Sequence, residues 1–309
     1  MEVIWKAKDF ARTFRNPVLT LGNFDGVHLG HQRIFQRVRE KAREIGGESI
    51  AYTFEPHPVQ MLKPERAPFL LLPMDERLRL IGELGIDVVI CAPFTPEFAN
   101  QTAEEFVRDI LHAQIGAREV FVGQNTTFGR GREGSVLLLK EMGKRFDFAV
   151  EGVEAVQVEG VIVSSSRIRR LIREGDMHGA AKLLGRHHLL VGQVIHGHGR
   201  GSKKLGFPTA NLKTAEVLFP KPGIYAVWAL YEGRRYLAVA NLGWNPTFQD
   251  RKFSIEVHIL DFQKDLYGQN LRVEFVERLR DEVTFHGPEE LVVQIKKDVE
   301  QAKKVLRIN

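Results

Sequence analysis

Two histidines that follow a short apolar run have the types and spacing for phosphate chemistry. The run Val18–Leu21 leads through the turn Gly22–Val27 to His28, Gly30 and His31. Residues three apart share one helical face, and a helix start offers free N–H groups and the positive end of its dipole. Two imidazoles there can stabilise charge that develops on a transferring phosphoryl group. Plain surface histidines fit the spacing too, and so does a zinc pair, although metalloprotease histidines are four apart with a Glu between them.

A cluster of serines and arginines offers an anion clamp further along the chain. Ser164, Ser165 and Ser166 precede Arg167 and Arg169 at the start of an expected helix. Hydroxyls at a helix N-terminus, together with an arginine, can bind phosphate. Taken alone, the serines can equally be an N-cap of that helix.

The second half begins with a glycine-rich basic loop followed by oxygen-bearing side chains. In the loop 196–206, glycines with Arg and Lys can wrap N–H groups and cationic heads around phosphates. A loose basic loop or an RNA contact fits this composition as well. Thr209 and Asn211, which follow Pro208, are two apart and share a face if the chain is extended. Their neutral oxygens suit a magnesium ion that carries a nucleotide.

One carboxylate lies on the polar face of a strand with an alternating pattern. Phe253, Ile255, Val257 and Ile259 make an apolar face, so Glu256 points the other way. Taken without the neighbouring motifs, such a residue is a solvated carboxylate on an exposed sheet face.

The elements that position these residues change character near the middle of the chain. In the first half, short apolar runs predict buried strands. Amphipathic segments between them predict helices, and one helix opens with the capping box Thr102–Glu105 and runs through Leu111. Strands that alternate with helices favour a doubly wound parallel sheet. The expected strands are Val18–Leu21, Ser49–Phe54, Asp87–Cys91 and Glu119–Val122, and another expected helix is Gln32–Ile45.

From about residue 190, short strands broken by Gly, Pro and Asn predict a small antiparallel barrel or sandwich. Residues Tyr231–Arg234 form a hairpin signal, and a helix that begins near Pro288 closes the chain. We expect a helix at Met177–Leu184 and a boundary near Gly185, giving domains 1–185 and 186–309. The expected strands are Val191–Ile195, Gly223–Tyr231, Tyr236–Asn241, Phe253–Asp261 and Leu271–Leu279.

Composition limits the class of protein. A chain of 309 residues with 43% hydrophobic and 27% charged residues is that of an ordinary globular protein. No apolar run reaches the ~18 residues of a membrane span, and no signal peptide is visible. The single cysteine, Cys91, excludes an internal disulfide, so we expect a cytoplasmic protein. The net charge of +5 favours anionic partners, and its even spread argues against a dedicated nucleic-acid binder.

One glycine pattern matches a dinucleotide-binding motif but lacks the context that the motif requires. Residues Gly129–Gly134 spell GxGxxG, with Glu154 about twenty residues on. A dinucleotide fingerprint requires its tight turn directly after a strand, and here six residues intervene. We therefore reject a nicotinamide dinucleotide site at this loop.

The N-terminal motifs resemble the nucleotidylyltransferase superfamily. His28-Leu29-Gly30-His31 resembles its HxGH signature, and Val163–Arg169 resembles its ISSTxIR motif. Thr53–Pro58 and Gly123–Gly129 are similar to two segments that border the flavin in bacterial FAD synthetases, although Thr126 stands where an aromatic is usual. The resemblance implies ATP contacts by Gly22, Phe24, Asp25, Gly26, His28, His31, Ser164, Ser165, Ser166 and Arg169, and flavin contacts by Phe54, Pro56, Pro58, Asn125 and Phe128.

The C-terminal motifs resemble riboflavin kinases. Phe207–Asn211 is similar to the PTAN motif, and further matches follow in family order through Asn241, Ile255–Phe262 and Arg280. The resemblance implies that Glu256 is the base for the ribityl 5′-hydroxyl and that Thr209 and Asn211 hold Mg²⁺. It also implies ATP contacts by Gly197, Gly199, Arg200, Gly201, Gly206, Pro208, Thr209 and Asn211, and flavin contacts by Glu256 and Arg280.

The resemblance spans nearly the whole chain and identifies it as similar to bacterial bifunctional riboflavin kinase/FAD synthetases. It implies a Rossmann-like nucleotidylyltransferase domain followed by an antiparallel β-barrel kinase domain with a C-terminal helix. The expected substrates are riboflavin, FMN and ATP with Mg²⁺, and the expected product is FAD. His28, His31, Arg169 and Glu256 are the expected catalytic residues. We expect no nucleic-acid or membrane partner, and a homo-oligomer stays open.

Two rival functions are weighed against this one. A nucleic-acid binder would use the basic loops 130–132 and 200–204, but few aromatics interleave with those residues. A nucleotidylyltransferase for another acceptor would use the second half only as a binding module. The intact Pro208–Asn211 motif and the placement of Glu256 weigh against that alternative.

Overall fold

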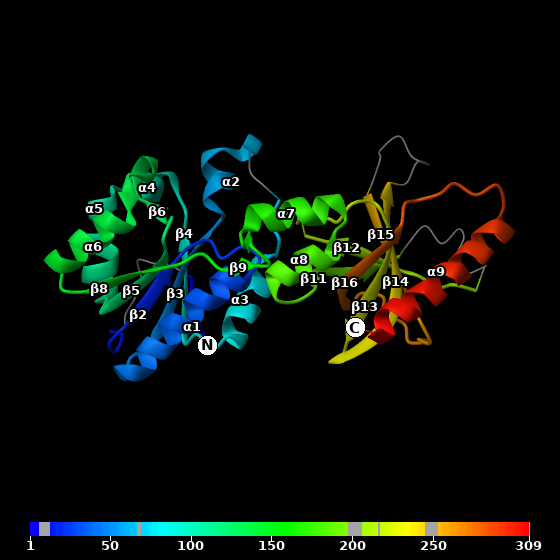
Figure 1. Ribbon diagram of the computed structural model, residues 1–309, viewed down its shortest axis with the longest axis horizontal. Helices are drawn as coiled ribbons and strands as arrows, with labels where there is room; N and C mark the ends of the chain where they lie inside the picture. The colour runs from blue at the N-terminus through cyan, green and yellow to red at the C-terminus, as the bar shows by residue number, and fades with distance from the viewer. Residues whose placement is uncertain (6–12, 67–68, 197–205, 216, 245–252, 309) are drawn as a thin grey trace. The chain divides into compact units, whose positions relative to one another are not determined.

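The computed structural model describes residues 1–5, 13–66, 69–196, 206–215, 217–244 and 253–308. The chain forms two compact units (Figure 1). The first comprises residues 1–69 and 74–163, and the second comprises residues 70–73 and 164–309.

The first unit is built on a six-stranded parallel sheet, as the alternating pattern predicts. Its strand order is β1 (Glu2–Ile4), β4 (Val88–Pro93), β3 (Ser49–Glu55), β2 (Val18–Leu21), β5 (Glu119–Gly123) and β8 (Ala149–Val153). Strand β2 pairs with β3 on one side and β5 on the other. The order of strands reverses at β2, and such a switch point leaves a crevice outside the carboxyl ends of the strands.

Helices cover both faces of this sheet (Figure 1). The α-helices are α1 (Leu29–Glu44), α2 (Pro58–Leu62), α3 (Met74–Glu83), α4 (Pro96–Ala99), α5 (Ala103–Glu105) and α6 (Val136–Arg145). The π-helix η2 (Phe106–Ile115) continues α5, and η1 (Pro64–Arg66) and η3 (Arg130–Arg132) are single 3₁₀ turns. Two short hairpins complete the unit: β6 (Thr127–Phe128) with β7 (Gly134–Ser135), and β9 (Gln157–Val158) with β10 (Val161–Ile162).

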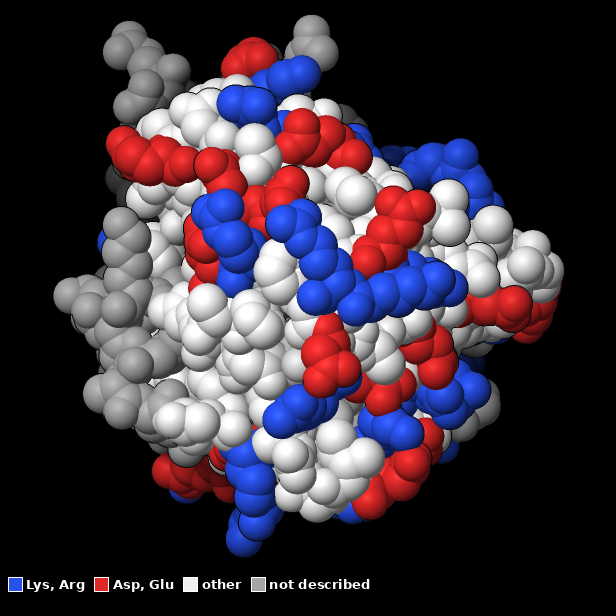
Figure 2. All heavy atoms as spheres, turned by 90° about the vertical axis from the view of Figure 1, so that its left-hand side faces the viewer, with Lys and Arg blue, Asp and Glu red and all other residues white. Residues whose placement is uncertain are grey.

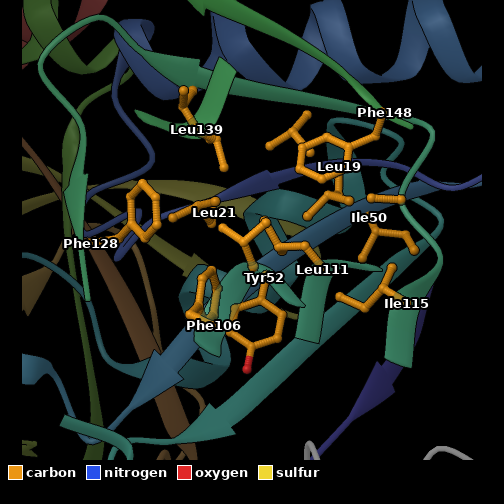
Figure 3. Packing of buried hydrophobic residues seen from close by; sticks show 14 of the residues in the cluster. Leu19, Leu21, Ile50, Tyr52, Phe106, Leu111, Ile115, Phe128, Leu139 and Phe148 are labelled. Atoms are coloured by element: carbon orange, nitrogen blue, oxygen red, sulfur yellow. The ribbon is translucent and has the colours of Figure 1, made fainter. Parts of the chain in front are cut away.

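The main core of the first unit lies between the sheet and the helical segments η2 and α6. Leu19 and Tyr52 from the strands pack with Phe106, Leu111 and others from the helices (Figure 3). The opposite face of the sheet carries α1, from which Phe35 and Val38 are fully buried. Side chains of a strand alternate between two faces. Both faces are covered here, which explains the continuously apolar strands.

The expected local signals of the first unit are largely confirmed. Thr102 and Glu105 form the capping box, but the helix runs to Ile115 rather than Leu111. Helix α1 starts at Leu29, three residues before the expected Gln32, because His28 caps it. Residues 129–133 link the strands of the β6–β7 hairpin, so no strand-to-helix dinucleotide turn exists there.

The second unit contains two helices, a closed barrel and a terminal helix. The helices are α7 (Ser165–Glu174) and α8 (Met177–Leu184). The barrel order is β11 (His188–Ile195), β12 (Ala210–Thr214), β15 (Phe253–Ile259), β14 (Arg234–Trp244), β13 (Gly223–Tyr231) and β16 (Asn270–Arg280). Helix α9 (Pro288–Ile308) packs through Val299, Ala302 and Leu306 against barrel residues such as Ala226.

The closed barrel confirms the fold that the resemblance implied, and it resolves the choice between barrel and sandwich that the strand pattern left open. All of its pairings are antiparallel. The hairpin between β13 and β14 turns through Glu232 and Gly233, both with positive φ, which is the geometry of a type I′ turn. Strand β12, which carries Asn211, was not expected from the apolar pattern because its exposed and buried positions are mixed.

Candidate active sites

The turn between β2 and α1 is built on the carboxyl edge of the first sheet. Gly22 donates its N–H to the Tyr52 carbonyl at 3.0 Å, which anchors the start of the turn to β3. A Cβ at Gly22 would lie 3.0 Å from the Phe24 ring, so any larger residue here would have to displace that ring. Phe24, Gly26 and Val27 all have positive φ. The turn is therefore held in a conformation that most residues avoid.

The two histidines at the end of this turn lie against each other. The His28 and His31 rings stack with centroids 3.6 Å apart, and Phe24 meets His31 edge-on at 5.5 Å. His28 is only 6% exposed and is the N-cap of α1, because its Nδ1 accepts the His31 N–H at 3.4 Å. A neutral imidazole that accepts at Nδ1 carries its proton on Nε2. His28 can therefore present an Nε2–H donor while it caps the helix.

Two of the residues expected to contact flavin are joined by one aromatic cluster. Phe54 on β3 lies 5.4 Å from Phe98, Phe98 lies 6.0 Å from Phe106, and Phe106 lies 5.9 Å from Phe128. Gly129 has φ 73°, and a Cβ there would lie 2.6 Å from the Ala103 backbone. Only glycine fits this position. It holds Phe128 against the helical side of the cluster.

The other residues of this half that are expected to contact flavin do not belong to the aromatic cluster. Pro56 is half-buried, and Pro58 is the first residue of α2, whose N-cap is His57. Asn125 is exposed in the loop after β5, and Thr126 beside it donates its N–H to Gly123. Their flavin contacts stay predictions.

The serine–arginine segment belongs to the second unit and starts α7. The Ser164 hydroxyl accepts the Arg167 N–H at 3.3 Å, so Ser164 is the N-cap. Ser165 follows in the first turn, Ser166 is exposed, and Arg169 is buried. The N-cap interpretation thus holds for Ser164, while the ATP contacts expected for this segment stay predictions.

A row of polar residues crosses three adjacent strands of the barrel. Glu256 on β15 is directly opposite Asn211 on β12 and also opposite Asn241 on β14. Directly opposed residues share one face of a sheet. Ile255, Val257 and Ile259 are buried on the other face, as the alternation predicts. The Asn241 Oδ1 atom is buried and has no hydrogen-bond partner among the described residues.

His258 fixes the start of the Thr209–Asn211 segment. Its Nδ1 lies 2.8 Å from the Pro208 carbonyl oxygen, and its ring meets Phe207 edge-on at 5.5 Å. Thr209 also lines a cavity of about 440 Å³ whose apolar wall includes Val257, Ile259 and Phe262. Gly206 has φ 85° and leads into this segment. Gly197, Gly199, Arg200 and Gly201 lie outside the described residues.

Arg280 is tied to the terminal helix. Its Nε and Nη2 hold Asp298 of α9 at 2.8 and 2.7 Å, and its Nη1 donates to the Asp281 carbonyl. Asp298 is 3% exposed and also accepts from Gln294. The guanidinium therefore joins the end of β16 to α9, and its expected flavin contact stays a prediction.

Comparisons with known proteins match each half to a different enzyme. A model described as FAD synthetase matches residues 11–167, and a model described as riboflavin kinase matches residues 184–306. A protein of Haemophilus influenzae named bifunctional riboflavin kinase/FMN adenylyltransferase is 36% identical over 98% of both chains. A protein of the same name from Pseudomonas fluorescens is 39% identical over 94% of this chain and 93% of its own. The chain belongs to the bifunctional riboflavin kinase/FMN adenylyltransferase family.

A solved structure shares the architecture of this chain. A Streptococcus pneumoniae protein named macrolide-efflux protein is 32% identical, with a TM-score of 0.89, and the match covers 98% of this chain and 99% of that one. None of the described helices of the present chain is long and apolar enough to cross a membrane.

Two residues lie next to residues of the riboflavin kinase motifs, but neither of them could be given a role from the sequence. Asn241 reads there as one polar residue in an apolar strand, and only the strand register places it beside Glu256. His258 shares the Glu256 face by alternation, but its contact with Pro208 joins residues fifty positions apart. A polar residue in the middle of an apolar run was the available signal for Asn241.

Proposed function

We propose that this bifunctional enzyme phosphorylates riboflavin to FMN in its C-terminal half and adenylylates FMN to FAD in its N-terminal half. The observation that carries the proposal is the presence of both family matches in one chain. We propose the division at 185/186, which lies just inside the riboflavin kinase match that begins at residue 184. Helices α7 and α8 nevertheless group with the barrel in the second compact unit.

In the kinase step, Glu256 accepts the proton of the ribityl 5′-hydroxyl. The hydroxyl oxygen attacks the γ-phosphorus of ATP, the bond to the β-phosphate oxygen breaks, and FMN and ADP result. The strand pairing with Asn211 and Asn241 on both sides holds the Glu256 backbone in place. His258 supports the same arrangement by holding the Pro208 carbonyl.

The residues present fit a magnesium ion beside Glu256. Thr209 and Asn211 offer neutral oxygens, and the buried Asn241 Oδ1 is an acceptor with no hydrogen-bond donor among the described residues. Mg²⁺ takes few protein ligands when it arrives with a nucleotide. Bound there, the ion would neutralise charge on the transferring phosphates. We propose Thr209 and Asn211 as its protein contacts.

In the adenylyl step, a phosphate oxygen of FMN attacks the α-phosphorus of ATP and pyrophosphate leaves. The FMN phosphate is already ionised at neutral pH, so the step needs orientation and charge neutralisation rather than a strong base. His28 supplies an Nε2–H donor toward the phosphates, with His31 as a further proposed donor. From the sequence resemblance alone, we also propose Ser165 and Arg169 as phosphate donors. The aromatic cluster around Phe54 and Phe128 supports an apolar flavin site next to this turn.

One incubation tests both halves. Purified enzyme with riboflavin, ATP and Mg²⁺ should yield FMN and then FAD by chromatography, and supplied FMN should yield FAD with pyrophosphate. Absence of FMN from riboflavin would overturn the kinase assignment, and absence of FAD from FMN would overturn the adenylyl assignment. Metal analysis belongs in the same experiment, because stoichiometric zinc would favour the zinc-pair interpretation of His28 and His31.

We also propose a cytoplasmic location, supported by the single cysteine and by a need for ATP in both steps. Fractionation of cells that express the tagged chain tests this. A homo-oligomer is a further proposal, and sedimentation of the purified enzyme decides it.

A further inference from the structure

The most deeply buried cation of the described first unit lies under the β2–α1 turn. Arg77, on α3, is 0% exposed, and its Nη1 donates to the Asn23 carbonyl oxygen at 3.1 Å. Its Nε and Nη2 are buried and make no hydrogen bond to any described residue. Buried guanidinium donors without partners are rare, so the position calls for a reason beyond packing.

Carboxylates on two segments of the site balance this charge. Burial lowers the pKa of Arg77, while Asp25 in the turn and Glu55 at the end of β3 act in the opposite direction. Asp25 is 2% exposed, and the Glu55 Oε2 is buried without a hydrogen-bond partner among the described residues. An arginine keeps its proton even when buried. Arg77 is therefore a permanent cation between the β2–α1 turn, which carries Asp25, and the end of β3, which carries Glu55.

The bond to Asn23 fixes the direction of one peptide group. The carbonyl of Asn23 and the N–H of Phe24 belong to the same peptide unit, and in a trans peptide they point in opposite directions. With the carbonyl drawn inward to Arg77, the Phe24 N–H must point away from α3. That N–H donates to no described residue, and Phe24 has φ 48°, so the local backbone does not favour this geometry by itself.

We propose that Arg77 is a positioning residue for adenylyl transfer, which holds the Asn23–Phe24 peptide so that its N–H faces the ATP phosphates. The inference rests on the proposed adenylyl function of the N-terminal half. A backbone donor aimed at a developing phosphate charge stabilises the transition state, and its value depends on being held before the reaction. Arg77 does this from behind the turn and does not touch the substrate.

The test compares Arg77→Met and Arg77→Lys in the full-length enzyme. Arg77→Met removes the hydrogen bond and the charge at similar volume. It should lower kcat for FAD formation about 10- to 100-fold, since a misplaced donor loses most of its effect. Arg77→Lys keeps the charge but not the planar fork, and should lower kcat about 3- to 10-fold. In both variants, the KM for FMN and the rate of FMN formation from riboflavin should stay within about twofold.

A matched control is available in the same unit. Arg39 also donates through Nη1 to a backbone carbonyl, that of Leu84 at 3.0 Å, and also has a buried Nε without a described partner. Leu84 precedes β4, so this bond lies at the opposite edge of the sheet from the turn. Arg39→Met should destabilise the unit and leave kcat for FAD formation unchanged.

Melting curves by circular dichroism accompany every rate. A folded Arg77→Met variant with wild-type kcat overturns the proposal, as does a loss matched by Arg39→Met. If Arg77→Met does not fold, Arg77→Lys decides, because wild-type kcat in that folded variant also overturns it. A wild-type enzyme that makes no FAD refutes the proposed function instead, which keeps the two failures apart.

Discussion

His28 caps a helix and is also a proposed phosphate donor, and different substitutions can separate these two roles. As the N-cap of α1, its Nδ1 accepts the His31 N–H at 3.4 Å, longer than a normal hydrogen bond. Losing such a cap should cost about 0.5–1 kcal/mol, the lower part of the usual range. As the proposed Nε2–H donor to phosphate, it should contribute about 10²–10³-fold to the rate, or roughly 2.7–4 kcal/mol. The rate effect should therefore far exceed the stability effect.

Three variants measure these two quantities. His28→Ala should lose both the cap and the donor. His28→Ser keeps a capping oxygen but is too short to reach the phosphates, so it should melt like the wild type and still lose ~10²–10³-fold in kcat. Ser135→Ala is the control, because Ser135 caps α6 in the same unit by accepting the Leu138 N–H at 3.3 Å. It should lose cap stability and no FAD synthesis.

The assay follows FAD from supplied FMN and ATP by chromatography, next to melting curves and FMN formation from riboflavin. FMN formation should persist in all three variants. Near-normal FAD synthesis in His28→Ser would refute the reasoning, because the residue would then matter only as a cap. Stoichiometric bound zinc in the wild type would refute it in another way.

Three further outcomes are expected. Glu256→Gln keeps the side chain's shape but removes the base, so FMN formation should fall about 10²–10⁴-fold while FAD formation from supplied FMN stays near normal; equal loss of both activities contradicts independent sites. A fragment of residues 186–309 should still make FMN, and a short fragment that folds but is inactive would refute the boundary. A longer fragment of residues 164–309 should melt at a higher temperature than the short one, because α7 and α8 group with the barrel. Burial lowers the pKa of His188 from 6.5 to about 4. Between those values only the unfolded chain binds the proton, so the free energy of unfolding should fall by up to ~3 kcal/mol as pH drops through this window, and His188→Leu should flatten that slope.

The sequence predicted the elements whose signal is local. Strand β2 is apolar throughout, and Met177–Leu184 is a helix with the expected bounds. The signal was weak for strands at the sheet edges. Strand β1 is only three residues long and pairs with β4, more than eighty residues away. Strand β8 contains Glu151 and Gly152, which break its apolar pattern.

The candidate sites divide in the same way. His28, Glu256 and Asn211 stand in motifs that are contiguous in the chain, so their residue types and spacing were enough to single them out. Arg77 was not singled out, and Asn241 was named in a family match but given no role, because each is locally an ordinary residue of its helix or strand. Their significance lies in the partner that folding brings to them.

The sequence by itself determined the two domain types, the residues of the motifs and the family that they resemble. The antiparallel barrel that the resemblance implied is confirmed. Only the tertiary structure decided the order of its strands, that Glu256 has an asparagine on each side, and that a buried arginine donates to the turn between β2 and α1. The physical reason is the distance along the chain between the residues that interact. Capping, alternation and turn formation involve neighbours along the chain. Strand register and the burial of a charge depend on contacts between residues far apart in sequence, which exist only once the core has formed.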